Sequence, residues 1–163
     1  KARLKKIEQQ RHSISLLLDG VGDVRNIGTI FRLADAAWLE KIYTFGPKPD
    51  LNPKKLKRIA RSTNRFIPYE HLPGVEAVKA LKERADLIGL EITTASIPYR
   101  KLEVNRPIVL VIGSEQQGVS EELLALTDQC IHLPMYGINT SMNVAMATSI
   151  AVYGLMEKFR QKE

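Results

Sequence analysis

The chain has 163 residues, of which 44% are hydrophobic and 26% are charged, which is the composition of a globular protein large enough for one domain with a core. It contains no run of about 20 apolar residues, so we expect no membrane-spanning helix, and the charged segment 1–11 lacks the apolar stretch of a signal peptide. The single cysteine, Cys130, excludes an intrachain disulfide, and we expect a reducing, cytoplasmic location.

The net charge of +6 is concentrated in two segments. Residues 48–65 contain seven basic residues and one acidic residue, and residues 1–11 contain five basic residues and one acidic residue. Such clustering is typical of a polyanion-binding surface, although a solvated surface helix has the same composition. We expect residues 1–12 to form a basic N-terminal arm and residues 13–163 to form one domain.

In the first half of the chain, short apolar runs alternate with amphipathic segments. The run Ile14–Leu18 ends at Asp19 and predicts a buried strand. Asn26 is a suitable helix cap for the apolar residues that follow at helical spacing, which are Ile27, Ile30, Phe31, Ala34 and Trp38. The next expected elements are a strand at 41–45, a short basic helix from about residue 53, a strand at 65–69 and a helix at 75–87.

The second half of the chain continues this alternation. We expect strands at 90–95, 108–112 and 130–133, a helix capped by Ser120, a loop at 134–142 and a last helix at 143–159. Glu121 and Glu122 lie in the first turn of the helix after Ser120, where they oppose the positive end of its dipole. The pattern predicts an α/β fold, with a mostly parallel sheet and helices on both faces.

Ligands of such sheets bind beyond the carboxyl ends of the strands, and three loops have this position: 19–26, 113–119 and 134–142. The first loop contains Gly20-x-Gly22-x-x-Arg25, in which arginine replaces the third glycine of a dinucleotide fingerprint. The second loop lacks the Lys-Ser/Thr pair of a phosphate loop. These departures disfavour a nucleotide-binding Rossmann-like protein, which stays an alternative.

Metal and nucleophile motifs are not apparent in the sequence. The three histidines, His12, His71 and His132, are far apart, and Cys130 has no neighbouring pair of ligands. The sequence also lacks the G-x-S-x-G elbow of a serine hydrolase. We therefore expect no metal.

Five polar residues stand out because they lie at or near the three loops: Asn26, Arg32, Glu115, Ser141 and Asn143. Each has a structural explanation when it is taken singly. Asn26 and Ser141 are possible helix caps, Arg32 can pair with Asp35 three residues later, and Glu115 can be solvated.

Taken together, the segments around these residues resemble the three motifs of the TrmH family of SPOUT RNA 2′-O-ribose methyltransferases. The motifs are Asn26-Ile-Gly-Thr-Ile-Phe-Arg32, then Val109-Leu-Val-Ile-Gly-Ser-Glu115-Gln-Gln-Gly118, and then Ile131-His-Leu-Pro-Met-Tyr-Gly137 with Ser141-Met-Asn143-Val-Ala-Met-Ala147. Three motifs in this order are a specific signal. One departure is Trp38, which stands where the family often has the glycine that ends the first motif helix.

The resemblance implies a deep C-terminal trefoil knot, a homodimer with the last helix in the interface, and S-adenosylmethionine as the cofactor. The residues that match the cofactor-binding positions of the family are Thr94, Ala95, Gly113, Ile131, Leu133, Met135 and Met142. It also implies methyl transfer to a ribose 2′-hydroxyl of structured RNA, either tRNA or rRNA, without a membrane or a metal as partner.

The chemistry of the implied reaction suits the residue types. Arg32 is permanently cationic and forked, so it can bind an RNA phosphate with two hydrogen bonds, and in the family this phosphate helps to remove the hydroxyl proton. Asn26, Glu115, Ser141 and Asn143 would hold the reacting groups in line. The alternative is a non-catalytic RNA-binding module on the same fold, which the retention of these five residues disfavours.

Overall fold

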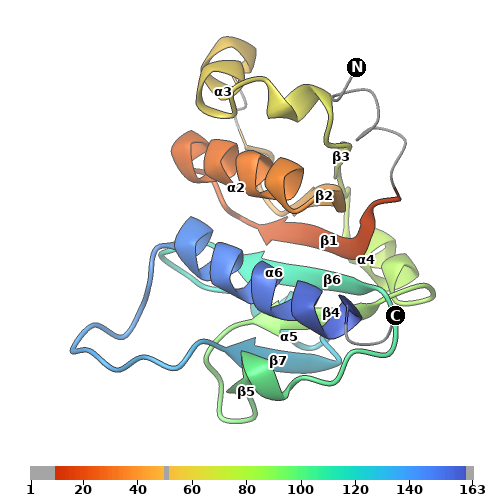
Figure 1. The fold of residues 1–163 in the computed structure, drawn as a ribbon, viewed down its shortest axis with the longest axis vertical. Coiled ribbons are helices and arrows are strands. Elements are labelled where there is room, and N and C mark those ends of the chain that lie inside the picture. The colour runs from red at the N-terminus through yellow and green to blue at the C-terminus, as the bar shows by residue number, and fades with distance from the viewer. Residues whose placement is uncertain (1–9, 50–51, 161–163) are drawn as a thin grey trace.

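The computed structural model describes residues 10–49 and 52–160. A seven-stranded sheet in the order β3-β2-β1-β6-β4-β7-β5 forms its centre, and every strand pair in it is parallel (Figure 1). The strands are β1 (His12–Asp19), β2 (Leu39–Phe45), β3 (Tyr69–His71), β4 (Asp86–Leu90), β5 (Ile97–Pro98), β6 (Ile108–Gly113) and β7 (Gln129–His132). The helices are α2 (Val24–Ala36), α3 (Pro53–Ile59), α4 (Val75–Leu81), α5 (Glu121–Leu124) and α6 (Val144–Arg160), with 3-10 turns η1 (Thr63–Arg65) and η2 (Tyr99–Lys101).

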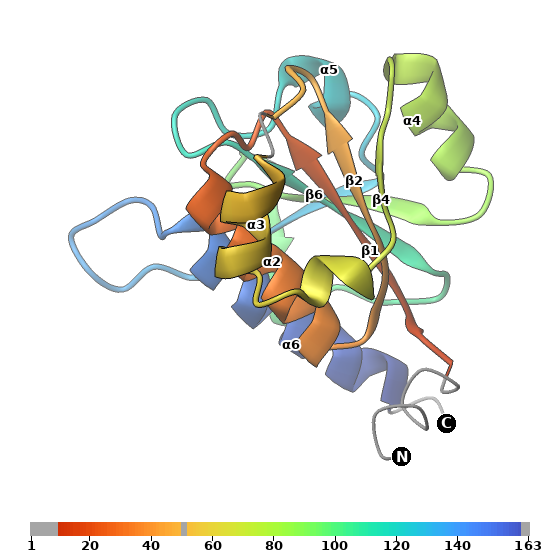
Figure 2. The same ribbon diagram turned by 90° about the horizontal axis from the view of Figure 1, so that it is seen from above.

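Helices cover both faces of the sheet, as expected from the alternating pattern. Ile14, Leu16 and Leu18 of β1 belong to the core beneath α2, α3 and α6, whereas Leu17 belongs to the core beneath α4 and α5. Figure 2 shows these two helical layers on opposite sides of the sheet. The sheet is buried on both faces because side chains alternate between them along each strand.

Two expected element boundaries were wrong in the middle of the chain. The helix expected at 75–87 ends at Leu81, and the strand expected at 90–95 is β4, at Asp86–Leu90. The apolar residue Leu87 suggested a longer helix, but it is a buried strand residue of the α4–α5 core. Consequently residues 91–96 form a turn rather than a strand, and the short strand β5 follows them.

The strand expected at 65–69 is β3, which lies a few residues later in the chain, at Tyr69–His71. Residues 63–65 instead form the turn η1, and β3 begins only at Tyr69. The other strands and the last helix lie within a few residues of the expected ranges, and Ser120 caps α5 as expected, accepting from Leu123 N.

The cap of helix α2 lies three residues before the expected one, so the assignment of Asn26 as the cap was wrong. Asp23 has an extended backbone and its carboxylate accepts a hydrogen bond from Arg25 N at 2.8 Å, which makes it the cap. Asn26 therefore lies in the first turn of the helix, and its side chain is available for bonds to other loops.

Trp38 has a φ of 50°, in the left-handed region that favours glycine, so the backbone is strained where α2 ends. The guanidinium of Arg11 lies 4.0 Å from the centre of the Trp38 ring and donates to the carbonyls of Leu39 and Phe66. Arg11 and His12 are therefore built into the sheet, since β1 begins at His12. Residues 1–9 of the expected basic arm lie outside the described residues.

The parallel arrangement gathers the carboxyl ends of the strands at one edge of the sheet. The loops after β1, β4, β6 and β7 meet there because these strands are close neighbours in the sheet. The sheet order also reverses direction at the β1–β6 pair, since β2 and β3 lie on one side of it and the later strands on the other. Ligand sites of α/β sheets form at such a switch point. None of the described helices is long and apolar enough to span a membrane.

The Asp23 cap gives a stability prediction. Asp23→Ala should lower the free energy of unfolding by about 1 kcal/mol at pH 7, because the first turn of α2 loses its acceptor. Hydrogen bonds from the Arg25 side chain and backbone lower the pKa of Asp23 from 3.8 to about 2. A lowered pKa stabilises the fold above the ordinary pKa, so the difference between wild type and variant should shrink as the pH falls from about 4 towards 2.

Urea denaturation over this pH range measures the effect. Asp23→Asn is the matched control, because it keeps a capping oxygen and cannot titrate. The Asp23 side chain is 34% exposed, so solvent screens its ion pair with Arg25 and the capping bond carries most of the effect. Equal stability of wild type and Asp23→Ala at pH 7 would show that the cap does not set the start of α2.

Candidate functional site

A chain of side-chain hydrogen bonds joins three of the loops at this edge. Asn143 Nδ2 donates to Asn26 Oδ1 at 3.1 Å, and Asn26 Nδ2 donates to Glu115 Oε1. Three of the five polar residues singled out in the sequence therefore touch one another, although they come from the first, second and third motifs. We call this set of residues the asparagine relay.

Asn143 also sets the start of the last helix. Its Oδ1 accepts hydrogen bonds from Ala145 N at 2.9 Å and Met146 N at 3.2 Å, as a helix cap does. Its amide is thus fully used, with the oxygen on α6 and the nitrogen on Asn26. The loop before α6 is held to the start of α2 through this one side chain.

The other two polar residues lie outside the relay. Arg32 is exposed on α2, and within the described part of the chain it makes no hydrogen bond or ion pair, so the pair with Asp35 is absent. Ser141 is exposed and lines a small cavity beside Met142. Both are therefore available to a ligand.

The loop after β6 is a tight turn, and this turn presents Glu115. Gly118 N donates to Ser114 O at 2.9 Å, and Gly118 has a φ of 67°, which favours glycine. A side chain on Gly113 would overlap the backbone of Gly118 and Val119. Glycine at 113 is therefore required by the turn itself, so a substitution there would disturb the turn and could not test for a cofactor alone.

A cavity of about 160 Å³ lies where the loops after β4 and β7 meet. Leu133, Met135 and Met142 line it, together with Ser141. An adjoining cavity of about 210 Å³ shares Leu133 and Met142. Thr94, Ala95, Gly113 and Ile131, the other residues expected to bind the cofactor, do not line either cavity. Thr94 and Ala95 are exposed on the turn between β4 and β5, and Ile131 is fully buried in β7.

Two further residues at this cavity were missed in the sequence. Glu91 Oε2 accepts from Val119 N at 2.9 Å, which fastens the β4 loop to the β6 loop. His132 Nδ1 lies 2.9 Å from Ser96 Oγ, which joins the β7 loop to the same turn. The sequence signal that could have identified Glu91 is a carboxylate directly after a buried strand. We missed it because β4 was expected at 90–95, which placed Glu91 inside the strand.

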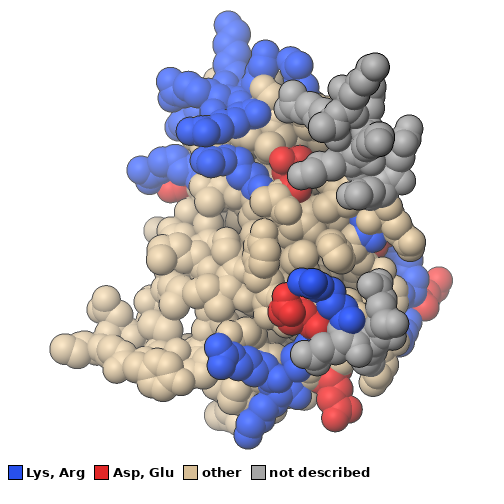
Figure 3. Space-filling model, viewed as in Figure 1, with Lys and Arg blue, Asp and Glu red and all other residues tan. Residues whose placement is uncertain are grey.

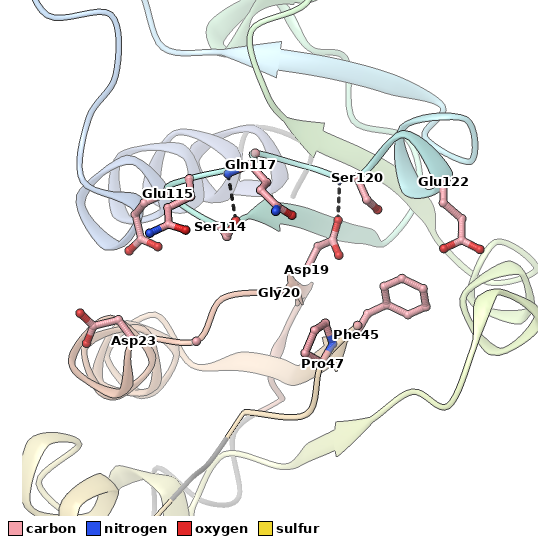
Figure 4. Close-up of a pocket in the computed structure, with 14 residues that line it drawn as sticks. Asp19, Gly20, Asp23, Phe45, Pro47, Ser114, Glu115, Gln117, Ser120 and Glu122 are labelled. Carbon is pink, nitrogen blue, oxygen red and sulfur yellow. Dashed lines mark hydrogen bonds between the residues drawn. The ribbon is translucent and has the colours of Figure 1, made fainter.

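A larger cavity lies on the other side of the Glu115 loop. Its volume is about 760 Å³, and it opens between the ends of β1 and β2 and the 114–118 turn (Figure 4). Asp19, Asp23, Glu115 and Glu122 are the charged residues that line it. Among residues 10–49 and 52–160, no group of three or more His, Cys, Asp or Glu could hold a metal ion.

Comparison with known proteins identifies the family. The model of the SpoU rRNA methylase family matches residues 13–153. The chain belongs to the SpoU family, also named TrmH. It is 29% identical to the tRNA (guanosine(18)-2′-O)-methyltransferase of Aquifex aeolicus, over 96% of this chain and 74% of that protein. It is 35% identical to the 23S rRNA (guanosine(2553)-2′-O)-methyltransferase of Bacillus subtilis, over 86% of this chain and 56% of that protein.

Solved structures of SpoU proteins have the same fold. The A. aeolicus TrmH/SpoU tRNA modifying enzyme aligns with a TM-score of 0.85 at 26% identity, over 99% of this chain and 84% of that one. An AdoMet-bound rRNA methyltransferase from Sinorhizobium meliloti aligns with a TM-score of 0.84 at 27% identity, over 94% of this chain and 59% of that one. This SpoU protein is accordingly an RNA methyltransferase, and S-adenosylmethionine is its cofactor.

The two ends of the Asn143 amide give a prediction that separates folding from activity. Asn143→Asp keeps the acceptor for α6 but places an oxygen against Asn26 Oδ1 instead of a donor. The variant should unfold at nearly the wild-type temperature, whereas methyl transfer should fall at least about 100-fold, because a misplaced reacting group costs that much. Thermal unfolding and single-turnover transfer of a tritiated methyl group to undermodified RNA measure the two effects.

Asn143→Ala serves as the comparison variant, because it removes both ends of the amide. It should lose about 1 kcal/mol of stability through the cap and should be as inactive as Asn143→Asp. Normal turnover in Asn143→Asp would show that the relay bond to Asn26 has no part in the reaction.

Proposed function

We propose that this chain transfers a methyl group from S-adenosylmethionine to a ribose 2′-hydroxyl of structured RNA. The observation that carries the proposal is the asparagine relay, which joins one residue from each motif at the carboxyl edge of the sheet. The named activities of the Aquifex and Bacillus relatives support ribose as the acceptor. Both of those proteins act on guanosine, one in tRNA and one in rRNA.

The reaction needs a base and precise alignment, because a ribose hydroxyl is a poor nucleophile. S-adenosylmethionine supplies the electrophilic methyl group. The guanidinium of Arg32 binds an RNA phosphate with two hydrogen bonds, and this phosphate accepts the 2′-hydroxyl proton as the oxygen–methyl bond forms. Arg32 can do so because its side chain is exposed and makes no bond within the described residues. The relay and Ser141 hold the ribose and the methyl donor in line.

The cavities at Leu133 and Met142 fit the cofactor. Their walls are apolar at Leu133, Met135 and Met142, which suits an adenine ring and a thioether-like chain, and Ser141 provides a polar group at the rim. Gly113 and the exposed turn at Thr94 and Ala95 lie on the neighbouring loops, where backbone groups can bind the ends of the cofactor. Ile131 is buried in β7, where its carbonyl accepts from Glu91 N, so it supports the β4 and β7 loops from beneath the cofactor.

The finer architecture is also part of the proposal. The chain leaves β7 near one edge of the sheet and returns through residues 133–143, after which α6 crosses the face of the sheet over β6 and packs beside α2 (Figure 1). This path is consistent with a C-terminal segment that threads a preceding loop to form a trefoil knot. Such a knot would clamp the loops of the cofactor site together.

A homodimer is consistent with the apolar surface of the last segment. Met146, Ile150 and Tyr153 of α6 are 59%, 41% and 49% exposed, and Tyr136 and Ile138 of the projecting loop are 94% and 100% exposed. Exposed apolar side chains gathered on one side mark interaction surfaces. We assign this surface to a second copy of the chain, with the last helix in the interface. An RNA substrate and a free cysteine suit a cytoplasmic location.

The phosphates of the RNA lie on a basic surface formed by α3. Lys54, Lys55, Lys57 and Arg58 are exposed there, and Figure 3 shows Lys and Arg side chains gathered over α3 and part of α2. Helix α3 packs tightly on α2 at Gly28, where any side chain would overlap Ile59. This contact places the basic α3 surface beside the helix that carries Arg32.

The proposal is tested most directly at Arg32. Arg32→Ala should change the free energy of unfolding by less than about 0.5 kcal/mol, because the side chain is exposed and unbonded within the described structure. Single-turnover methyl transfer to undermodified RNA should be almost abolished, while the affinity for S-adenosylmethionine, measured by calorimetry, should be unchanged. Arg32→Lys should also fail, because an ammonium group lacks the fork that binds phosphate bidentately.

Arg25→Ala is the matched control, since Arg25 is another exposed arginine of α2, and it should turn over normally. Near wild-type rates in Arg32→Ala would refute the role of Arg32. Cofactor binding and RNA binding without any methyl transfer by the wild type would favour the non-catalytic RNA-binding module.

The basic α3 surface gives a salt-dependence prediction. Replacing Lys54, Lys55, Lys57 and Arg58 with glutamine should weaken RNA binding and flatten its dependence on salt, by roughly 0.7–0.9 in logarithmic slope for each RNA phosphate that the variant no longer neutralises. Fluorescence anisotropy at several salt concentrations measures the slope. Replacing Lys79 and Arg84, which are exposed near α4 on the other face of the sheet, controls for the loss of positive charge outside α3 and should leave the slope nearly unchanged. An unaltered slope in the α3 variant would assign this surface to solubility.

A further inference from the structure

The cavity of about 760 Å³ has no part in the reaction as described above, although it shares Glu115 with the asparagine relay. It lies at the switch point between β1 and β6, where α/β sheets bind their ligands. Its volume of about 760 Å³ is large enough for a nucleoside. Because Glu115 accepts from Asn26, a molecule in this cavity would lie directly beside the relay.

The Asp19 carboxylate lies in the wall of this cavity, and one of its two oxygens accepts no hydrogen bond from the described residues. Asp19 is only 6% exposed, and its Oδ2 accepts a hydrogen bond from Ser120 N at 2.7 Å (Figure 4). Within the described residues its Oδ1 accepts no hydrogen bond, and it is not enclosed by protein atoms. This oxygen lies on the side of Gly46, which also lines the cavity. Buried carboxylates are normally fully paired, so Asp19 Oδ1 is an acceptor presented to a ligand.

The charges of the wall decide what kind of ligand fits. Among the described residues that line the cavity are the carboxylates of Asp19, Asp23, Glu115 and Glu122, and none of these described residues is a lysine, arginine or histidine. A phosphate group is therefore repelled, and the group that enters must present hydrogen-bond donors without negative charge. In RNA the ribose 2′-hydroxyl and the edges of the bases meet this condition, but within the chain only a base edge offers two adjacent donors, because the 3′ oxygen of the ribose is esterified. The phosphates have a separate place on the basic α3 surface.

A glycine in the wall leaves space that the protein does not use. No atom lies within 4 Å of the position that a Cβ would take on Gly22, and its φ lies outside the left-handed region. Neither packing nor backbone conformation therefore requires glycine at this position. The missing side chain leaves room for a ligand in the cavity to approach the backbone at Gly22.

We infer that this cavity binds the base of the nucleotide to be methylated, and that Asp19 selects guanine. The inference rests on the proposed function. Guanine carries two adjacent donors, N1–H and the N2 amino group, which can both point at the one open oxygen of Asp19, because a carboxylate oxygen has two lone pairs. Adenine and cytosine place an unprotonated ring nitrogen beside their amino group, and uracil places its single N–H between two carbonyls, so each opposes the carboxylate with an acceptor. Pro47 adds apolar surface to the wall.

Saturation-transfer NMR on the whole chain without cofactor tests the inference. Guanosine at millimolar concentration should give the strongest signal, inosine, which lacks the N2 amino group, a weaker one, and adenosine and uridine the weakest. Asp19→Asn keeps an oxygen for Ser120 N but turns a donor towards the cavity, so guanosine affinity should fall at least about tenfold. Equal signals from all four nucleosides, or unchanged guanosine affinity in Asp19→Asn, would overturn the inference.

A second pair of variants tests the space in the cavity. Gly22→Leu should abolish guanosine binding, whereas Gly74→Leu should not, because Gly74 also has no atom within 4 Å of its Cβ position but lies at the start of α4. Both variants should keep the wild-type unfolding temperature. A third measurement adds manganese to the protein and follows the NMR resonances of residues that line the cavity. If manganese broadens these resonances and guanosine does not displace it, the cavity is a cation site and the inference is wrong.

These measurements involve no methyl transfer, so they test the inference independently of the proposed function. Wild-type methyl transfer to RNA together with absent guanosine binding would remove the role of Asp19 and leave the reaction standing. Selective guanosine binding without any methyl transfer to RNA would support the role of Asp19 and refute the proposed function.

Discussion

The amide of Asn26 holds the candidate site together because both of its ends are used. Its nitrogen donates to Glu115 and its oxygen accepts from Asn143, so turning the amide over would set donor against donor and acceptor against acceptor. An aspartate at this position would have no donor for Glu115. Three loops from the ends of different strands are thereby fixed relative to one another through one short side chain whose own position is set by the capped start of α2.

The surroundings of Asn26 explain why one short side chain is enough to hold the three loops in place. The tight turn at Gly113 and Gly118 presents Glu115 from a rigid backbone, and Glu91 fastens this turn to the loop after β4. Asn143 uses its oxygen to cap the start of α6. The relay therefore joins elements that are each already rigid, which is the condition for holding reacting groups in line.

Charge is divided around this centre in a way that suits one RNA nucleotide. The exposed lysines and arginines of α3 lie beside the helix that carries Arg32, whereas all charged side chains that line the cavity beyond Glu115 in the described part of the chain are carboxylates. In our proposal, phosphates occupy the first surface and a base the second, and the ribose between them meets the relay. The apolar slot at Leu133 and Met142 faces the relay from the other side of the Glu115 loop.

The sequence by itself determined the parts of this protein that depend on local periodicity. Short apolar runs that alternate with amphipathic segments predicted a mostly parallel sheet with helices on both faces, and the order of three motifs predicted the family. It misplaced β4 because a single apolar residue, Leu87, suits either a helix or a strand, and it mistook Asn26 for a cap because an asparagine before an apolar helix looks the same in either role. Only the tertiary structure decided that Asn26 bonds to partners 89 and 117 residues away, and that Asp19 keeps one oxygen open to a cavity. Contacts over such separations depend on which strands become neighbours, and no local pattern encodes that.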